Sequence, residues 1–349
     1  MEYRKIYGVL PDLLLPWYRN NRRELPWRAD KDPYHIWVSE IMLQQTRVEA
    51  VKGYYSRFLQ QIPNVQALAE ADDDLLHKLW EGLGYYSRVR NMKKAAISIM
   101  QEHGGVFPRE YEKIRTLPGI GPYTAGAICS IAFDLPTPAV DGNVLRVISR
   151  LTEDATPIDL PAYKKQTEQN LKEIYPPDAG DFTQALMELG ATVCGPNREP
   201  DCGNCPCRYI CMAGKAGTAE KLPVKLPKKG RREEDRTVFI LRCGDKYALE
   251  KRPGKGLLAG LWQFPNVMGK LDAASAISEV EKNGLKPTEI KRIVEKKHIF
   301  THIQWNMSGV YMEVREETAG LRWFTAEQIN AAAALPTAFR QFWEEAGDV

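Results

Sequence analysis

The chain has 349 residues, which is enough for roughly two domains of about 150 residues each. Its net charge is +3 and 27% of its residues are charged, a mildly basic balance that permits a polyanionic partner without requiring one. No apolar stretch approaches the ~18 residues of a membrane span, and no charged start leads into the apolar run of a secretory signal. We therefore expect a cytoplasmic protein that does not bind membranes.

The first 212 residues are predicted to be mostly helical. Turn signals such as Gly104-Gly105 and Pro176-Pro177 separate segments of helical periodicity. The expected helices are 9–20, 33–58, 73–79, 88–102, 122–133, 144–151, 162–174 and 182–193. No alternating strand pattern interrupts them, so this half indicates an all-α domain.

A carboxylate lies inside the most apolar of these helices. Residues 36–43 are apolar nearly all round, which is typical of a buried helix, and Glu40 is among them. Burial favours the protonated form of a carboxyl group, and an acid that stays protonated near neutral pH has the profile of a general acid. The alternative is a glutamate that reaches solvent through a gap in the helix face. We favour the acid because Gln44, Gln45 and Thr46 follow with side chains that can read a base.

A glycine turn and a lone carboxylate flank the helix expected at 122–133. Gly119 and Gly121 allow backbone angles and close approach that other residues resist, and Pro122 suits a first helical position. Free N–H groups at such a helix start can hold a phosphate, and Asp141 follows the helix. An ordinary tight turn and an aspartate that caps the next helix give the same pattern. Together with the buried acid, the segment favours a nucleic-acid backbone held beside carboxylates.

Five of the seven cysteines lie between positions 194 and 211. An odd number packed this closely is typical of a metal site rather than a disulfide framework. The spacing suits four thiolates around either a tetrahedral zinc ion or a [4Fe–4S] cluster, with Cys207 as an extra thiol. The four expected ligands are Cys194, Cys202, Cys205 and Cys211. We expect a structural role, and Arg198 and Arg208 give the loop positive charge for phosphates.

The composition changes after residue 212. Between Lys215 and Arg232 there are seven basic residues, one acid and two prolines, which predicts a semi-extended linker over residues 213–232. The remainder, 233–349, has mixed periodicity and indicates an α+β domain. Strands are expected at 237–242, 246–251, 302–314 and 321–324, and helices at 273–283 and 326–332.

These features together resemble the helix-hairpin-helix DNA glycosylases with an iron–sulfur loop and, within them, the MutY family of adenine DNA glycosylases. The resemblance covers nearly the whole chain. It rests on the cysteine spacing and on SEIMLQQT at 39–46, EGLGYYSR at 81–88, LPGIGPYTAGAI at 117–128 and VDGNV at 140–144. It implies a multi-domain fold, with an all-α helix-hairpin-helix catalytic core over 1–212 and a Nudix-like lesion-recognition domain over 233–349. It also implies a [4Fe–4S] cluster on the four cysteines.

The resemblance further implies a partner and a reaction. The partner is double-stranded DNA that contains adenine opposite 8-oxoguanine or guanine, and a monomer is the default expectation. Glu40 would protonate N7 of adenine, and Asp141 would stabilise the oxocarbenium-like sugar, with a covalent intermediate as one route. Tyr123 and Asn143 match positions that support these carboxylates.

The same resemblance assigns substrate contacts. Gly119 and Gly121 would hold the DNA backbone, and Gln45 and Tyr85 match residues that wedge into the duplex. The residues expected to contact the target base and its surroundings in the catalytic domain are Trp27, Arg28, Gln45, Thr46, Leu83, Tyr85 and Gln184. Trp27, Arg28 and Gln184 match the positions that line the adenine pocket.

Tyr123 predicts a subclass. Related bifunctional enzymes such as endonuclease III carry a lysine at this hairpin position, and that lysine forms a Schiff base before the strand is nicked. Tyrosine cannot do this, so we expect a monofunctional glycosylase. The alternative is an endonuclease III-like glycosylase/lyase for oxidised pyrimidines, which Tyr123 and the extra C-terminal domain disfavour.

The C-terminal domain resembles Nudix hydrolases with a broken catalytic box. Ile277-Ser278 replaces the usual Arg-Glu pair, and Glu281-Lys282 replaces the usual Glu-Glu. A lysine opposes the clustered oxygen ligands that Mg²⁺ needs. We therefore expect binding rather than hydrolysis, which disfavours a Nudix pyrophosphohydrolase with a DNA-binding half.

The Phe300-Thr301-His302 segment matches the Phe-Ser-His turn with which the family reads 8-oxoguanine. On the segment alone, a hairpin with a buried phenylalanine is the simpler interpretation, and the family context favours a lesion contact. A purely DNA-binding protein without catalysis is the remaining alternative. Glu40 and Asp141 argue against it, because acids near phosphates weaken simple binding.

Overall fold

The computed structural model describes residues 2–196, 199–227 and 230–346, which form two compact units. The first comprises Met1–Glu70 and Asn91–Pro227, and the second comprises Ala71–Arg90 and Lys228–Val349. Arg198, which we expected beside phosphates, lies outside the described residues, as do the last three residues of the expected C-terminal domain. The domain division at 212 and 233 stays a prediction.

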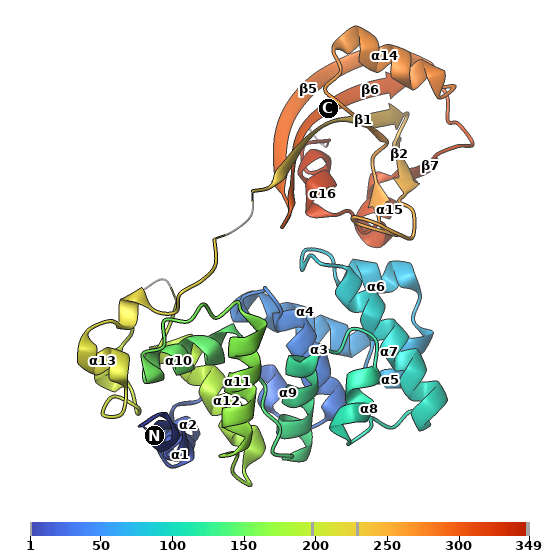
Figure 1. The fold of residues 1–349 in the computed structure, drawn as a ribbon. Helices are drawn as coiled ribbons and strands as arrows, with labels where there is room; N and C mark the ends of the chain where they lie inside the picture. Colours follow the sequence, from blue (N-terminus) through green and yellow to red (C-terminus); the bar gives the residue numbers. More distant parts are fainter. Residues whose placement is uncertain (1, 197–198, 228–229, 347–349) are drawn as a thin grey trace. The chain divides into compact units, whose positions relative to one another are not determined.

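The first unit is built from helices, as the periodicity predicted (Figure 1). Its elements before the unit boundary are α1 (Glu2–Gly8), α2 (Leu10–Asn21), η1 (Pro26–Arg28), α3 (Pro33–Leu43), α4 (Val48–Gln61) and α5 (Val65–Glu70). Those after it are α8 (Tyr111–Thr116), α9 (Pro122–Phe133), α10 (Gly142–Thr152), α11 (Pro161–Lys172), α12 (Ala179–Glu188), η2 (Leu189–Val193), η3 (Cys202–Asn204), α13 (Met212–Ala216) and η4 (Ala219–Lys221). The unit boundary falls inside α7 (Ser87–His103), which follows α6 (Asp73–Leu79). Among the described helices, none has the length and hydropathy that crossing a membrane requires.

Helix α3 begins at a capped proline and is buried along most of its length. The Asp32 side chain accepts a hydrogen bond from the backbone N–H of Tyr34, and Pro33 occupies the first turn, a favourable helix start. The single helix expected over 33–58 was wrong. Because Gln45 adopts a left-handed φ of 61°, α3 ends at Leu43 and α4 starts separately at Val48.

The turn between α8 and α9 needs glycine at one position. Gly119 has a φ of 79°, and a Cβ atom there would lie 2.6 Å from the Cβ of Asn91. Gly121 has a φ of −88° and open space around it, so the backbone constraint expected there is absent. No side chain caps this end of α9, and Gly121 keeps its first N–H groups uncovered.

The expected linker is packed over its first half. Residues 213–224 include α13 and η4, and Ala213, Ala219 and Leu222 form a small buried cluster with Cys211 and Val224. The semi-extended interpretation was therefore wrong for this stretch, because small apolar side chains between the basic residues find a surface to bury against.

The second unit contains a seven-stranded sheet. Its strands are β1 (Arg232–Cys243), β2 (Lys246–Lys251), β3 (Trp262–Gln263), β4 (Asn266–Met268), β5 (Pro287–Ile299), β6 (Ile303–Val314) and β7 (Arg322–Thr325). The main order is β3-β2-β1-β6-β5, with β4 paired to β1 and β7 paired to β2. Only β1 and β6 run parallel among these pairs, in register from Arg232 opposite Ile303 to Arg242 opposite Glu313.

Helices cover both faces of this sheet because side chains alternate along its strands. Val238 and Ile240 of β1 join the core beneath α15 (Ala326–Ala332) and α16 (Thr337–Trp343), whereas Phe239 and Leu241 join the core beneath α14 (Ala273–Lys282). Figure 1 shows α14 and α16 on opposite sides of the strands. The fold of the second unit is therefore a helix–sheet–helix sandwich.

Candidate active site

A cavity of about 1500 Å³ in the first unit brings together most of the catalytic-domain residues predicted from the sequence. The predicted residues that line it are Trp27, Arg28, Glu40, Gln45, Thr46, Tyr123, Asp141, Asn143 and Gln184. This volume exceeds the ~300–1000 Å³ of a typical small-molecule site. It therefore has room for a nucleobase together with the sugar and backbone attached to it.

Glu40 projects from α3 and is only 6% exposed. The hydroxyl of Tyr123, on α9, donates a hydrogen bond to its Oε2 atom. Burial is the main cause that raises the pKa of Glu40 to about 7; Asp141 raises it further, while Tyr123 and Arg28 act in the opposite direction. The side chain can therefore carry a proton at neutral pH, as a general acid requires.

Asp141 is both a helix cap and a cavity carboxylate. Its Oδ1 accepts from the backbone N–H of Val144 at 2.8 Å, which caps α10, and its Oδ2 accepts from Nδ2 of Asn143 at 2.7 Å. Burial raises the pKa of Asp141, and the hydrogen bonds from Val144 and Asn143 act against that rise. The two interpretations weighed from the sequence are thus compatible, because the cap fixes the carboxylate where it faces the cavity.

The amide of Asn143 is oriented by a residue that the sequence reasoning missed. Nη2 of Arg146 donates to Oδ1 of Asn143 at 3.0 Å, which leaves the Asn143 NH₂ group to face Asp141. Arg146 also donates to the carbonyls of Gly190 (2.7 Å) and Cys194 (2.9 Å). This arginine is 7% exposed and therefore ties Asn143 to the start of the cysteine loop.

Trp27 and Arg28 of η1 also line the cavity. Trp27 is buried with its ring edge-on to Tyr55 at 5.6 Å. Arg28 donates through Nη2 to Oε2 of Glu188 at 2.8 Å. Arg23 and Glu188 also line this cavity and were not predicted. The signal that could have found Glu188 is the one used for Glu40, a lone acid among apolar residues near the end of a helix.

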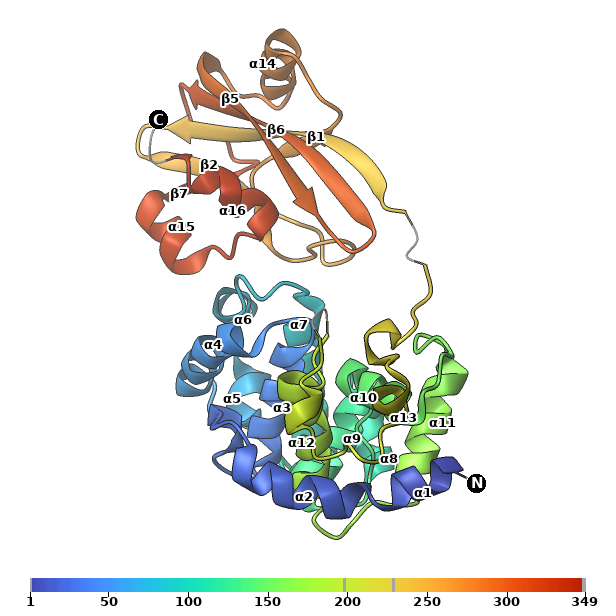
Figure 2. The same cartoon turned by 90° about the vertical axis from the view of Figure 1, so that its left-hand side faces the viewer.

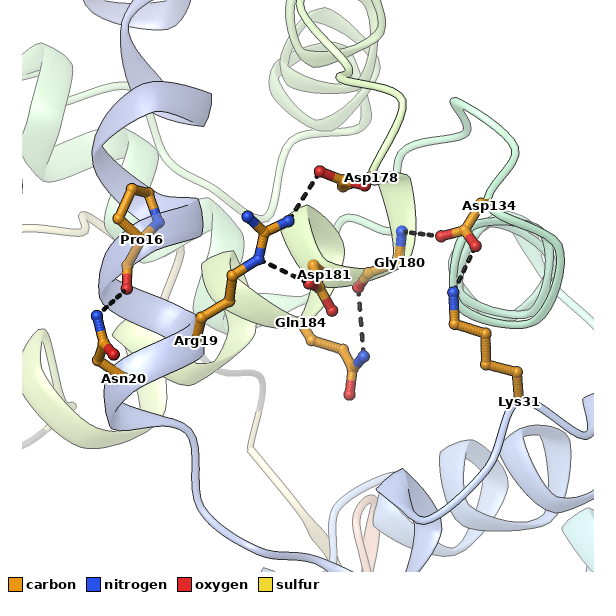
Figure 3. Close-up of polar contacts among 9 residues, drawn as sticks. All are labelled: Pro16, Arg19, Asn20, Lys31, Asp134, Asp178, Gly180, Asp181 and Gln184. Atoms are coloured by element: carbon orange, nitrogen blue, oxygen red, sulfur yellow. Dashed lines mark hydrogen bonds and ion pairs between the residues drawn. The ribbon is translucent and has the colours of Figure 1, made fainter.

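Gln184 reaches the cavity from α12, whose start is tied to α2. Figure 3 shows Arg19 between Asp178 at 2.8 Å and Asp181 at 3.3 Å, and Nε2 of Gln184 donates to the carbonyl of Gly180 at 3.3 Å. Helix α12 also packs against α9 (Figure 2). These contacts fix the helix. Gln184 contacts Gly180 through its amide nitrogen, so its amide oxygen takes no part in that hydrogen bond.

Both residues predicted to wedge into DNA have left-handed backbone angles. Gln45 has a φ of 61° and Tyr85 has a φ of 47°. Such angles are uncommon outside glycine and are concentrated at functional sites. Tyr85 belongs to the second unit, is 48% exposed, and its hydroxyl lies 2.8 Å from Oγ1 of Thr301. Leu83, in the same unit, is buried at 6% exposure.

The predicted lesion-reading residues form the turn between β5 and β6. The ring of Phe300 packs edge-on to His298 at 4.5 Å and to Trp305 at 4.8 Å, at the margin of the core. Phe300 thus supports the turn by packing against these two rings. Thr301 and His302 are exposed at its tip.

The four predicted cysteine ligands line a second cavity of about 510 Å³ in the first unit. Cys207 is buried in the neighbouring core and does not line this cavity. As the side chains lie, the described residues contain no three Cys, His, Asp or Glu groups spaced to hold one metal ion. Four thiols around one cavity are a donor set that either a tetrahedral zinc ion or a [4Fe–4S] cluster can take.

The altered Nudix box lies on α14. Ser278 and Glu281 are exposed, Ile277 packs on the core, and Lys282 pairs with Glu279 at 3.3 Å. The helix thus directs one of its acids to its own lysine.

Two family models match the chain. Residues 38–177 match an HhH-GPD superfamily base excision DNA repair protein, and residues 237–345 match a NUDIX domain. The adenine DNA glycosylase of Rattus norvegicus is 35% identical over 95% of this chain and 77% of that protein. That of Homo sapiens is 35% identical over 94% of this chain and 73% of that protein. The corresponding values for one Buchnera aphidicola protein of the same name are 34%, 88% and 87%.

Solved structures agree on the fold. A thermostable thymine-DNA glycosylase superposes with a TM-score of 0.55 and 28% identity, covering 61% of this chain and 98% of that one. Endonuclease III in a non-covalent DNA complex gives a TM-score of 0.52 at 21% identity, covering 62% and 97%. At that identity the second likeness speaks for the fold alone. The predicted helix-hairpin-helix core and Nudix-like domain are confirmed.

Proposed function

The chain belongs to the adenine DNA glycosylase family, and we propose that it removes adenine that lies opposite 8-oxoguanine or guanine in double-stranded DNA. Family membership makes it a DNA glycosylase of base excision repair that acts on adenine. We propose, in addition, the base that lies opposite adenine, the roles of the individual residues, the [4Fe–4S] cluster and glycosylase activity without strand nicking. The observation that carries the reaction is a pair of carboxylates in one cavity, the buried Glu40 and the partly buried Asp141.

The target adenine must leave the stack before these groups can reach it. It would enter the cavity near Trp27 and Arg28, and Gln184 would offer its amide oxygen to the exocyclic amine of the base. Gln45 and Tyr85 would occupy the distorted duplex, which suits their strained backbone angles. The uncovered N–H groups at the start of α9, next to Gly119 and Gly121, would hold a phosphate of the DNA backbone. Thr46 and Leu83 remain proposed contacts.

Glu40 would then transfer its proton to N7 of adenine, so that the base leaves as a neutral molecule. A pKa of about 7 keeps a large fraction of the acid protonated at neutral pH. Tyr123 would hold the carboxyl group in place while it gives up the proton, and its hydrogen bond stabilises the carboxylate that forms.

Asp141 would face the sugar as its glycosidic bond breaks. A carboxylate at this point stabilises positive charge on the sugar ring, either through space or by forming a covalent bond that water later breaks. The hydrogen bonds from Asn143 and Val144 orient it and help to keep it ionised despite its burial. Glu40 as acid and Asp141 as anion would thus divide the chemistry between two environments.

The four cysteines around the second cavity would hold a [4Fe–4S] cluster. This group would supply structural stability to the loop that follows η2, and no proton or bond change is routed through it. Arg150 supports the same loop, since its Nη1 donates to Sγ of Cys194 at 3.2 Å and its Nε donates to the carbonyl of Leu222 at 3.0 Å. The cluster would therefore stabilise the start of the cysteine loop, which Arg146 links to Asn143 through its hydrogen bonds to the Cys194 carbonyl and the Asn143 amide oxygen.

The second unit would read the base opposite adenine. Thr301 and His302 are exposed at the tip of the β5–β6 turn, and Phe300 holds that turn against Trp305. A hydroxyl and an imidazole can donate or accept hydrogen bonds, so they can distinguish 8-oxoguanine from other bases. The altered α14 sequence favours binding over Mg²⁺-dependent hydrolysis.

The test is single-turnover cleavage of short duplexes that carry adenine opposite 8-oxoguanine, adenine opposite guanine, or an oxidised pyrimidine. We expect cleavage at adenine that appears only after alkali, because Tyr123 cannot form the Schiff base that precedes strand nicking. Nicking without alkali, or action on the oxidised pyrimidine alone, would support the endonuclease III-like alternative.

A further inference from the structure

Glu188 is the most enclosed acid next to the reaction cavity, and its side chain is 0% exposed. It accepts two side-chain hydrogen bonds from Arg23, from Nε at 2.7 Å and from Nη2 at 3.0 Å, and one from the Arg23 backbone N–H at 3.2 Å. A fourth comes from Nη2 of Arg28 at 2.8 Å. One buried carboxylate therefore binds two guanidinium groups from a segment that is distant in sequence.

Both arginines face the same cavity as Glu40. Arg28 is 11% exposed, and its Nη1 donates to the backbone carbonyl of Arg23 at 3.0 Å, so it has little freedom to move. Arg23 is more open, at 36% exposed. Of the two, Arg28 favours the ionised form of Glu40, so an unbalanced positive charge on Arg28 would draw Glu40 toward the form that cannot act as an acid.

We propose that Glu188 is a positioning residue for the reaction: it fixes Arg23 and Arg28 at the base pocket and balances their charge beside Glu40. This proposal rests on the proposed function. It assigns Glu188 no contact with substrate, because its oxygens are occupied by the two arginines. Its effect on chemistry passes through the state of Glu40.

The charged and titratable groups around the two acids set the sign of the effect. The pKa of Glu40 is changed by three neighbouring groups: Tyr123 on α9, Asp141 at the start of α10, and Arg28 on η1. Arg28 is the cation among these three. Removing the negative charge of Glu188 therefore leaves the positive charge of Arg28 unbalanced. That charge lowers the pKa of Glu40 and favours its ionised form.

Glu188 itself is held ionised. Burial pushes the pKa of Glu188 upward, and the hydrogen bonds and charges of Arg23 and Arg28 outweigh this and lower it. On neighbouring elements, the negative charge of Glu49 on α4 favours the charged form of Arg23. The ring of Tyr18 on α2 lies against Arg28, with its centre 5.5 Å from the guanidinium carbon. Arg19 of α2 pairs with Asp178 and Asp181, so it does not compete for Glu188.

The experiment is the pH dependence of single-turnover adenine excision by the full-length protein and its Glu188→Gln variant. For the wild type, the rate should fall on the basic side as Glu40 ionises. In Glu188→Gln this fall should occur at lower pH, so that the loss of rate grows by roughly threefold or more between about pH 6 and about pH 8. Glu188→Asp, which keeps the charge, should restore the wild-type position of the fall even if its rate is lower.

An equal loss of rate at every pH would overturn the proposal, since that is what a merely structural role predicts. Folding is checked by binding to a duplex that lacks a cleavable adenine. If Glu188→Gln does not fold, Arg28→Gln gives the mirror test. Removing that cation should move the basic fall to higher pH, and an unmoved fall would overturn the proposal. If the wild type excises no adenine, the proposed function fails first and this inference fails with it.

Discussion

The replacement of Glu40 by glutamine should make the protein more stable, by an amount that grows from about pH 4.5 to about pH 7 and stays constant above that. Glu40 has a pKa raised from 4.5 to about 7 in the folded chain. Between these values the unfolded chain has lost the proton and the folded chain has kept it, so ionisation of the unfolded state favours unfolding. Stability that is present at low pH is therefore lost as the pH rises through about 7.

The size of this effect follows from the same pKa. A rise from 4.5 to about 7 corresponds to about 3 kcal/mol, because each pH unit is worth about 1.4 kcal/mol. Glutamine has a similar shape and no charge, and the Tyr123 hydroxyl can still donate to its amide oxygen. We expect Glu40→Gln to match the wild type near pH 4 and to exceed it by about 2–3 kcal/mol near pH 8.

The assay is urea unfolding at a series of pH values, followed by far-UV circular dichroism. Glu112→Gln, on the exposed face of α8, is the matched control and should change stability by less than about 0.5 kcal/mol at every pH. A Glu40→Gln difference that stays constant with pH, or that grows as the pH falls, would refute the reasoning.

Three further predictions concern other parts of the two units. Gly119→Ala should destabilise the protein by about 2–3 kcal/mol because of its positive φ and the close Asn91 side chain, whereas Gly121→Ala should change unfolding by less than about 0.5 kcal/mol; equal unfolding midpoints would contradict this. Arg146→Met should lower the free energy of unfolding by about 2–4 kcal/mol, because the Gly190 carbonyl and the Asn143 amide oxygen lose this donor and the Cys194 carbonyl keeps only the one from Arg150. It should also slow excision, and an unchanged rate would contradict the role given to Asn143. Thr301→Ala should reduce the preference for 8-oxoguanine over guanine opposite adenine by about fivefold, the value of one hydrogen bond, and should change stability by less than about 0.5 kcal/mol because its contact with the Tyr85 hydroxyl is exposed. A preference that is unchanged in competition assays would remove Thr301 from the lesion contact.

The carboxylate site could be predicted because its physical signature is local in sequence. Glu40 stands in an apolar helix, which by itself indicated an acid, and Asp141 follows a glycine turn and a helix as a lone carboxylate. The role of Asp141 at the sugar and its support by Asn143 were implied by the family resemblance. That they meet in one cavity depends on α3 packing against α9. The helix boundary after Leu43 could not be predicted, because glutamine at position 45 gives no sign of a left-handed backbone.

Residues that act through others were harder to find. Glu188 and Arg146 form hydrogen bonds to segments that are distant in sequence. The residues next to them in the sequence do not indicate which segments those are. Strand β5 was missed for a different reason. Its charged sequence suits an exposed edge, and register shifts near Pro287 and Ile290 interrupt its alternation.

The most direct test of the central claim compares the wild type with Glu40→Gln in single-turnover excision of adenine opposite 8-oxoguanine. We predict that the variant binds the duplex and loses excision by about 10²–10⁴-fold, the contribution of a general acid. A variant that excises adenine at close to the wild-type rate would contradict the assignment of Glu40 as the acid.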